Sequence, residues 1–206
     1  MSGPRLAVGG GRGPVLLLVL LSVVACGRGD TGAAGAARAA TDTAAGDGGA
    51  FRPLAIGEPV PAYAAPVVGG AAGDSVRIAV GDSASGAPLT LVNVWATWCT
   101  SCREEFGDLE RLHRDYGGRG VRVVAVSVDE SGDERVARFA KTEGVTFTIA
   151  HDPEGRVQRL YQTVGVPETY LVSGDGKLLW RHGGALRNGA ADAREAIDRA
   201  LGSATR

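Results

Sequence analysis

Residues 53–206 predict an α/β fold, a mixed sheet with helices on both faces. Two observations carry this prediction. Apolar, β-rich runs alternate with stretches whose apolar residues recur at helical spacing. A predicted hairpin and a helix close the chain, and strands that alternate with helices pack as an α/β sandwich. Roughly 150 residues are enough for one domain with its own core.

The first half of this domain leads into its most apolar strand. Residues 89–95 form a near-continuous apolar run, which is typical of a strand buried on both faces. The helix after it carries Phe106, Leu109 and Leu112 at helical spacing. The predicted strands are 76–80 and 89–95, and the predicted helix is 102–116. An extended, proline-containing entry over 59–66 precedes them, and a turn-rich stretch over 81–88 separates the two strands.

The second half continues the alternation after a break at the glycine-rich residues 117–120. Ser131 or Asp133 is predicted to cap the next helix, and Asp152 and Pro153 are predicted to start a short one. Residues 173–177 have the chemistry of a hairpin turn. The predicted strands are 121–128, 146–150 and the two hairpin strands 169–172 and 178–181. The predicted helices are 131–140, the short helix 152–161 and the final helix 190–201.

Cys99 and Cys102 form a Cys-x-x-Cys pair between the apolar strand and its helix. The N–H groups and dipole of a helix N-terminus stabilise an anion, so the first thiol can ionise near neutral pH. This strand-turn-helix context favours a redox pair. The alternatives are a zinc site, for which a second ligand pair is lacking, and a nucleophile paired with one of the three scattered histidines. No metal and no cofactor is expected.

The amino terminus predicts export. A modestly basic start precedes an uninterrupted apolar run over residues 15–25, which fits a signal peptide and is too short to cross a bilayer. The sequence Val23-Val24-Ala25-Cys26 resembles a bacterial lipobox, so residues 1–25 are expected to be removed and Cys26 to carry lipid. An ordinary cleaved signal and an uncleaved anchor are the alternatives.

Residues 26–52 are predicted to be a flexible tether between the lipid and the domain. They are rich in Gly, Ala, Thr and Asp and hold almost no large apolar side chain. If Cys26 is acylated, Cys99 and Cys102 are the cysteines left to pair. A bridge across so short a loop adds little stability, which favours a working disulfide over a structural one. The formal net charge of −1 and the pI of about 6.3 give no sign of the excess positive charge that nucleic-acid binding requires.

Two motifs make the chain resemble the thioredoxin superfamily. They are Val94-Trp95-Ala96-Thr97-Trp98-Cys99-Thr100-Ser101-Cys102 and Gly165-Val166-Pro167-Glu168-Thr169-Tyr170-Leu171-Val172. The chain is similar to the extracytoplasmic branch of TlpA/ResA-like and CcmG/DsbE-like proteins. The resemblance covers residues 55–200 and implies a thioredoxin-like sandwich with an N-terminal extension and an extra central helix. Peroxidases on this fold use a Pro-x-x-x-Thr-x-x-Cys loop, and Pro88 and Thr90 do not have that spacing to Cys99.

Chemistry and this resemblance together imply roles for the two cysteines and their neighbours. Cys99 is expected to be the more exposed, attacking thiol and Cys102 the buried, resolving one. Trp98 is expected to shield one side of the pair or to brace the turn. Val166 and Pro167 are expected to present extended backbone to substrate, with Pro167 in the cis form that the resemblance implies.

The resemblance also draws attention to two glutamates. Asn93 stands where thioredoxin has a buried aspartate, and Glu105 lies one turn beyond Cys102 on the same helix face. Glu105 is therefore expected to handle protons for Cys102, with a raised pKa if it is buried, or else to be an exposed surface residue. Glu168 is expected to shape partner choice or to lie in solvent.

The function implied is reduction of protein disulfides in the bacterial envelope. Apocytochrome c cysteines are the leading substrate by resemblance, and a membrane donor of the CcdA/DsbD type would recharge the dithiol of a monomeric, lipid-anchored protein. Donation of disulfides is the alternative direction, because the fold spans potentials from roughly −270 to about −120 mV. A tethered binding or holdase module is an alternative of another class.

Overall fold

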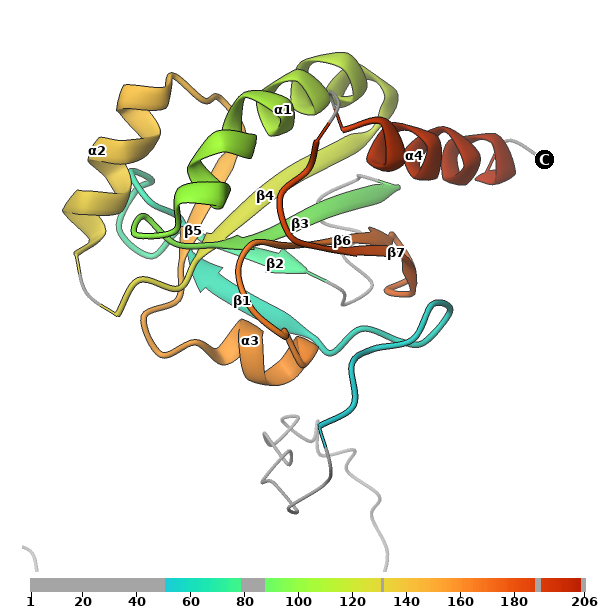
Figure 1. The fold of residues 1–206 in the computed structure, drawn as a ribbon, viewed down its shortest axis with the longest axis horizontal. Coiled ribbons are helices and arrows are strands. Elements are labelled where there is room, and N and C mark those ends of the chain that lie inside the picture. The colour runs from blue at the N-terminus through green and yellow to red at the C-terminus, as the bar shows by residue number, and fades with distance from the viewer. Residues whose placement is uncertain (1–50, 79–87, 131, 188–189, 205–206) are drawn as a thin grey trace, which may run out of the picture. The chain divides into compact units, whose positions relative to one another are not determined.

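The computed structural model describes residues 51–78, 88–130, 132–187 and 190–204 (Figure 1). All of these belong to one compact unit, Gly48–Arg206. The predicted signal peptide, Cys26 and nearly all of the predicted tether lie outside the described residues. So do Ser131 and most of the predicted turn-rich stretch.

A five-stranded mixed sheet forms the centre of the domain, in the order β5-β4-β3-β6-β7. Strand β3 pairs in parallel with β4 and antiparallel with β6. The strands are β3 (Leu89–Trp95), β4 (Val121–Ser127), β5 (Thr148–His151), β6 (Glu168–Ser173) and β7 (Leu178–Gly183). The predicted mixed α/β sandwich is confirmed.

Helices cover both faces of this sheet, which explains the apolar sequence of β3. Helices α1 (Thr100–Tyr116) and α4 (Ala191–Ala204) lie above the sheet in Figure 1, and α3 (Arg156–Tyr161) lies below it. All seven residues of β3 are buried. The central strand therefore places its carboxyl end, and the cysteine pair after it, in a fully packed setting.

The N-terminal extension is a small antiparallel hairpin that docks beside β5. Strand β1 (Tyr63–Pro66) pairs with β2 (Ser75–Ile78), so the predicted extended entry is partly a strand. The Val68 N–H donates to the Ile149 carbonyl at 2.9 Å, which ties the hairpin to the main sheet.

Aromatic side chains fill the core on the α1 side of the sheet. Trp95 packs edge-on against Phe106 with ring centroids 4.5 Å apart, and Phe139 and Phe147 lie within 5.6 Å of Phe106. Phe139 comes from α2 (Asp133–Glu143), the predicted extra central helix. This cluster locks α1 and α2 to the end of β3, from which the cysteine loop departs.

Two helix starts differ from the prediction. Gly132, in a left-handed conformation, caps α2 without a side-chain bond, and Asp133 is the first helical residue, with its carboxylate bonded to His151. Helix α3 begins at Arg156 because Gly155 before it is in a left-handed conformation with φ of 61°, so the helix does not extend back to Asp152. The Asp152 carboxylate instead accepts the Val157 N–H at 2.7 Å and caps the helix from five residues upstream.

The glycine-rich break after α1 is a 3-10 turn, η1 (Gly117–Arg119), followed by Gly120 with φ of 86°. A Cβ at Gly120 would lie 2.7 Å from Pro88 Cδ, so glycine is required there. This tight turn lets β4 enter beside the first residue of β3.

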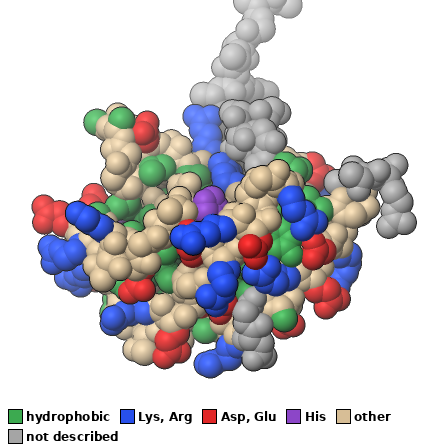
Figure 2. Space-filling model, turned by 90° about the horizontal axis from the view of Figure 1, so that it is seen from above, with side chains coloured by type: hydrophobic (Ala, Val, Ile, Leu, Met, Phe, Trp, Pro, Cys, Tyr) green, Lys and Arg blue, Asp and Glu red, His purple; other side chains and the backbone are tan. Residues whose placement is uncertain are grey.

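The surface over α1 carries charges of both signs, interspersed with apolar side chains (Figure 2). Ion pairs join Arg111 to Asp108 and Arg114 to Glu110 along that helix. Within the described part of the chain, no helix is long and apolar enough to cross a bilayer.

Candidate active site

Cys99 and Cys102 form a disulfide at the N-terminus of α1. Cys99 is the N-cap residue and has extended backbone geometry, and its Sγ accepts the Cys102 N–H at 3.2 Å. Cys99 is 7 % exposed and Cys102 is fully buried. Both cysteines are therefore buried in the disulfide form, and Cys99 is the more exposed of the two.

The electrostatics of this position favour a thiolate at Cys99. The first turn of α1 carries no acidic residue. Unpaired N–H groups at a helix N-terminus, together with the helix dipole, stabilise negative charge there. The Ser101 hydroxyl lies 3.5 Å from the Cys99 Sγ and adds a further polar contact. The site is therefore built to stabilise the reactive form of the first thiol.

The peptide bond between Val166 and Pro167 is cis, as the resemblance implied. The Val166 carbonyl oxygen lies 3.6 Å from the Cys99 Sγ, so the loop before β6 faces the disulfide. The Pro167 carbonyl accepts the Gly184 N–H at 2.8 Å, which joins this loop to the end of β7. The two segments that carry the sequence resemblance thus meet at the disulfide.

Glu105 is completely buried, one turn beyond Cys102, and is not a surface residue. Its Oε1 accepts a hydrogen bond from Asn93 Nδ2 at 2.9 Å, and its Oε2 accepts the Leu186 N–H at 2.8 Å. Burial raises its pKa from 4.5 to about 7, against the opposing effect of the two hydrogen bonds, and the nearby charge of Asp108 adds to the rise. Glu105 can therefore exchange a proton near neutral pH.

Asn93 connects this carboxylate to the strand that follows the cis proline. Its amide Nδ2 also donates to Thr169 Oγ1 at 3.0 Å, across the β3–β6 pair. Among the described residues, nothing forms a hydrogen bond with its buried Oδ1.

Glu168 is buried as well, with 1 % of its surface exposed. One carboxylate oxygen accepts the Val164 N–H at 2.9 Å, and the other bonds to the Arg181 guanidinium. Glu168 thus braces the loop that carries Pro167. It does not lie in solvent.

Trp98 lies on the surface beside Cys99, with 66 % of its area exposed. It therefore does not brace the turn by burial. Val164, two residues before Val166, is 71 % exposed. Large apolar side chains thus lie in solvent on both loops that border the disulfide.

Sequence reasoning missed a cluster of polar residues beside the cysteine loop. The Asp129 carboxylate accepts hydrogen bonds from the Thr97 N–H at 2.9 Å and from the Thr97 hydroxyl at 2.6 Å. His151 Nε2 lies 2.7 Å from the Asp129 carbonyl oxygen. The signal was available: Thr97, Asp129 and His151 stand at or just beyond the carboxyl ends of three neighbouring parallel strands, where functional groups gather in α/β sheets.

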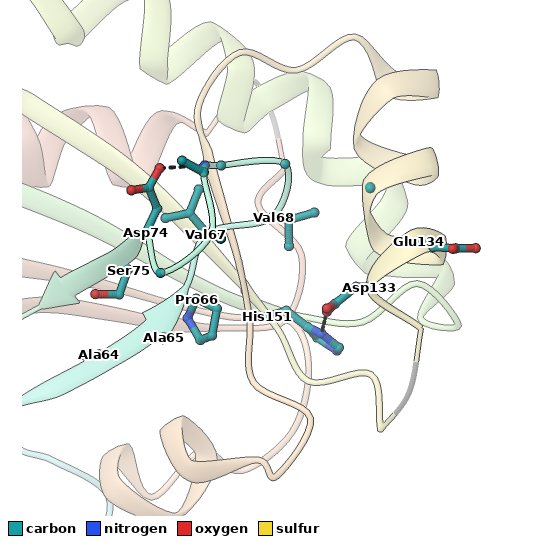
Figure 3. A pocket seen from close by; sticks show the side chains of 16 residues that line it. Ala64, Ala65, Pro66, Val67, Val68, Asp74, Ser75, Asp133, Glu134 and His151 are labelled. Atoms are coloured by element: carbon teal, nitrogen blue, oxygen red, sulfur yellow. Dashed lines mark hydrogen bonds and ion pairs between the residues drawn. The ribbon is translucent and has the colours of Figure 1, made fainter. Parts of the chain in front are cut away.

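A cavity of about 560 Å³ is lined in part by His151 (Figure 3). It lies between the β1–β2 hairpin and the start of α2, and Figure 3 shows the bond from His151 to Asp133 at its edge. Neither cysteine lines it. Within the described ranges, no group of three His, Cys, Asp or Glu side chains is arranged to hold a metal ion.

A model of the AhpC/TSA family matches residues 56–181, more than half of the chain. The chain belongs to the AhpC/TSA family. The matched segment contains both cysteines, Glu105 and the cis-proline loop, and it ends before Leu186.

Similar curated proteins of this thioredoxin-like group carry names from thiol–disulfide chemistry. The thiol-disulfide oxidoreductase ResA of Oceanobacillus iheyensis is 37 % identical over 89 residues, 43 % of this chain and 45 % of that protein. The thiol:disulfide interchange protein CycY of Rhizobium leguminosarum bv. viciae is 34 % identical over 110 residues, 53 % of this chain and 58 % of that protein. The chain thus spans about half the length of the curated relatives it matches.

Solved structures agree with this membership. A crystal structure of a candidate thiol:disulfide interchange protein DsbE from Chlorobium tepidum aligns with a TM-score of 0.63 and 29 % identity, covering 72 % of this chain and 99 % of that one. A DsbF homologue from Corynebacterium diphtheriae aligns with a TM-score of 0.58 and 23 % identity, covering 68 % and 85 %, and shows the shared fold.

The raised pKa of Glu105 predicts a pH-dependent loss of stability. Between 4.5, its ordinary value, and about 7, the folded state holds a proton that the unfolded state has released. Stability should therefore fall as pH rises through this window, by about 3 kcal/mol, and Glu105→Gln should not show this loss. Denaturant unfolding at pH 4 and pH 8 measures the difference.

The matched control for this prediction is Glu104→Gln, an exposed neighbour on the same helix. It should follow the pH dependence of the parent protein. An equal slope for the parent and for Glu105→Gln would show that Glu105 keeps an ordinary pKa.

Proposed function

We propose that this protein is a thiol–disulfide oxidoreductase that reduces disulfides of exported proteins. The observation that carries the proposal is the position of Cys99: it caps α1 with its Sγ 3.6 Å from the Val166 carbonyl of the cis-proline loop. The attacking thiol and a backbone edge for an extended substrate are thereby next to each other. The names of the relatives support the same chemistry.

The exchange takes place in two steps. The Cys99 thiolate attacks one sulfur of the substrate disulfide, which forms a mixed disulfide and releases the other substrate sulfur as a thiolate. The Cys102 thiol then loses its proton and attacks the Cys99 Sγ. The substrate leaves as a dithiol, and Cys99 and Cys102 are left oxidised as a disulfide. Glu105 is placed to receive the proton of Cys102, one turn away on the same helix, and its pKa of about 7 suits that transfer.

Cytochrome c maturation is the setting we propose for this reaction. The support is the similarity to CycY and to DsbE-like proteins, together with the predicted export signal. The haem-attachment cysteines of apocytochrome c would be the substrate. A membrane dithiol donor of the CcdA/DsbD type would return two electrons and two protons to the Cys99–Cys102 disulfide after each turnover.

Replacement of the resolving cysteine should trap substrates. In Cys102→Ala the first step proceeds and the second cannot, so mixed disulfides should accumulate on Cys99 and disappear on reduction. Non-reducing gels of cells producing the variant, followed by identification of the attached proteins, measure this. Cys99→Ala is the matched control, because the remaining Cys102 is buried. Full retention of function by Cys99→Ala would favour a binding module instead.

The direction of electron flow is tested by the reduction potential of the pair. A value near or below about −270 mV, measured in redox buffers with the tryptophan fluorescence as the reporter, is expected for a reductant. A value near about −120 mV would make the protein a disulfide donor and would reverse the proposed direction while leaving the site unchanged.

We further propose that Cys26 is acylated and anchors the protein in the cell envelope. The support is the apolar run over residues 15–25 and the lipobox-like sequence before Cys26. Cys26→Ala should move the protein from the membrane fraction to the soluble fraction, while Cys102→Ala should leave its distribution unchanged. Membrane fractionation with radiolabelled palmitate makes both comparisons, and an unlabelled parent protein would contradict the anchor.

A further inference from the structure

Asp129 is a buried carboxylate that accepts hydrogen bonds from Thr97 in the cysteine loop and from Ser127 at the end of β4. It lies two residues beyond β4 and is 2 % exposed. Oδ2 accepts the Thr97 N–H at 2.9 Å and the Ser127 hydroxyl at 2.6 Å, and Oδ1 accepts the Thr97 hydroxyl at 2.6 Å. A buried carboxylate is retained in a fold only when such donors replace its lost hydration.

The residue that Asp129 holds belongs to the three-residue connection between β3 and Cys99. Thr97 stands in its middle, and the Cys99 N–H donates to the Ala96 carbonyl at 3.2 Å across it. The Val128 N–H donates to the Trp95 carbonyl at 2.9 Å and keeps the two strand ends together. The path of the chain into the N-cap of α1 is thus set by contacts with the end of β4.

His151 contacts the backbone of Asp129. Its Nε2 meets the Asp129 carbonyl oxygen at 2.7 Å, and its Nδ1 bonds to Asp133 on the first turn of α2 (Figure 3). His151 is 5 % exposed, whereas the Asp133 side chain is 80 % exposed. Asp129, which anchors the cysteine loop, is therefore itself fixed through His151 by β5 and α2. The Asp129 side chain is buried and does not belong to the surface.

We propose that Asp129 is a positioning residue for disulfide exchange. By binding both the N–H and the hydroxyl of Thr97, it holds the loop so that Cys99 occupies the N-cap, where the N–H groups of α1 stabilise the thiolate. Its effect on rate passes through Thr97 and does not require contact with substrate. This inference rests on the proposed exchange activity and adds a residue that controls the reactivity of Cys99.

The test measures the thiol directly, without a protein substrate. In the reduced protein, the rate of Cys99 alkylation by iodoacetamide is followed against pH for Asp129→Ala, Thr97→Val and the double variant. Each single variant should react about tenfold more slowly at pH 7, since hydrogen bonds to a charged group are lost. The midpoint of the rate profile should rise by about one pH unit, as less stabilisation of the thiolate requires.

Two comparisons separate positioning from general stability. Thr97→Ser keeps the hydroxyl and should restore the parent midpoint, and the double variant should be no slower than the slower single variant, because both remove the same contact. Asp175→Asn, an exposed acid in the hairpin turn at the other end of β6, is the matched control and should change nothing. If Asp129→Ala does not fold, Thr97→Val decides the question.

Folded variants that keep the parent midpoint and rate would overturn the proposal and leave Asp129 a structural residue. A midpoint that falls in both Asp129→Ala and Asp129→Asn would also overturn it, because removal of the charge would then outweigh loss of the hydrogen bonds. Failure of the proposed function has a separate signature: Cys102→Ala would trap no protein while the alkylation profiles still shift.

Discussion

The position of Cys99 at the N-cap of α1 is the constraint on which the rest of the site depends. An N-cap residue leaves extended geometry just as the helix begins, so its side chain faces the free N–H groups of the first turn. Here that side chain is a thiol, and Cys102 is brought behind it by a single helical turn. The slight exposure of Cys99, the complete burial of Cys102 and the stabilisation of a thiolate at Cys99 all follow from this one placement.

Three loops surround the disulfide, and each is held by a buried carboxylate that accepts one of its backbone N–H groups. The pairs are Asp129 with Thr97, Glu168 with Val164, and Glu105 with Leu186. Each carboxylate is at most 2 % exposed, so each must have donors, and the loops supply them. The loops of the site are therefore held in place by buried hydrogen bonds of the fold itself.

The same arrangement places opposing influences on the thiols. The N-terminus of α1 favours the thiolate, whereas buried carboxylates near it disfavour further negative charge. Reduction potential depends on how well the reduced form is stabilised, which explains why one fold supports both reductants and oxidants. In this protein Glu105, which lies outside the Cys-x-x-Cys motif, has a pKa of about 7, so its charge can change near neutral pH.

The sequence by itself determined the α/β fold, the order of its elements and the cysteine pair. Apolar periodicity and turn chemistry are local properties, and they sufficed to predict every strand of the sheet. The resemblance supplied the cis form of Pro167, and the resemblance together with helical spacing to Cys102 pointed to Glu105. Helix starts were less accurate, because a left-handed Gly132 precedes α2 and because Asp152 caps α3 from outside the helix.

Only the tertiary structure decided which polar groups are buried together. Asp129 and Thr97 are 32 residues apart, and Glu105 and Leu186 are 81 apart. The parallel register that places Ser127 beside Trp95 creates the first contact, and the docking of the segment after β7 against α1 creates the second. A carboxylate has the same sequence signature in solvent and in a core, because its environment is set by strand pairing and helix packing across the whole domain.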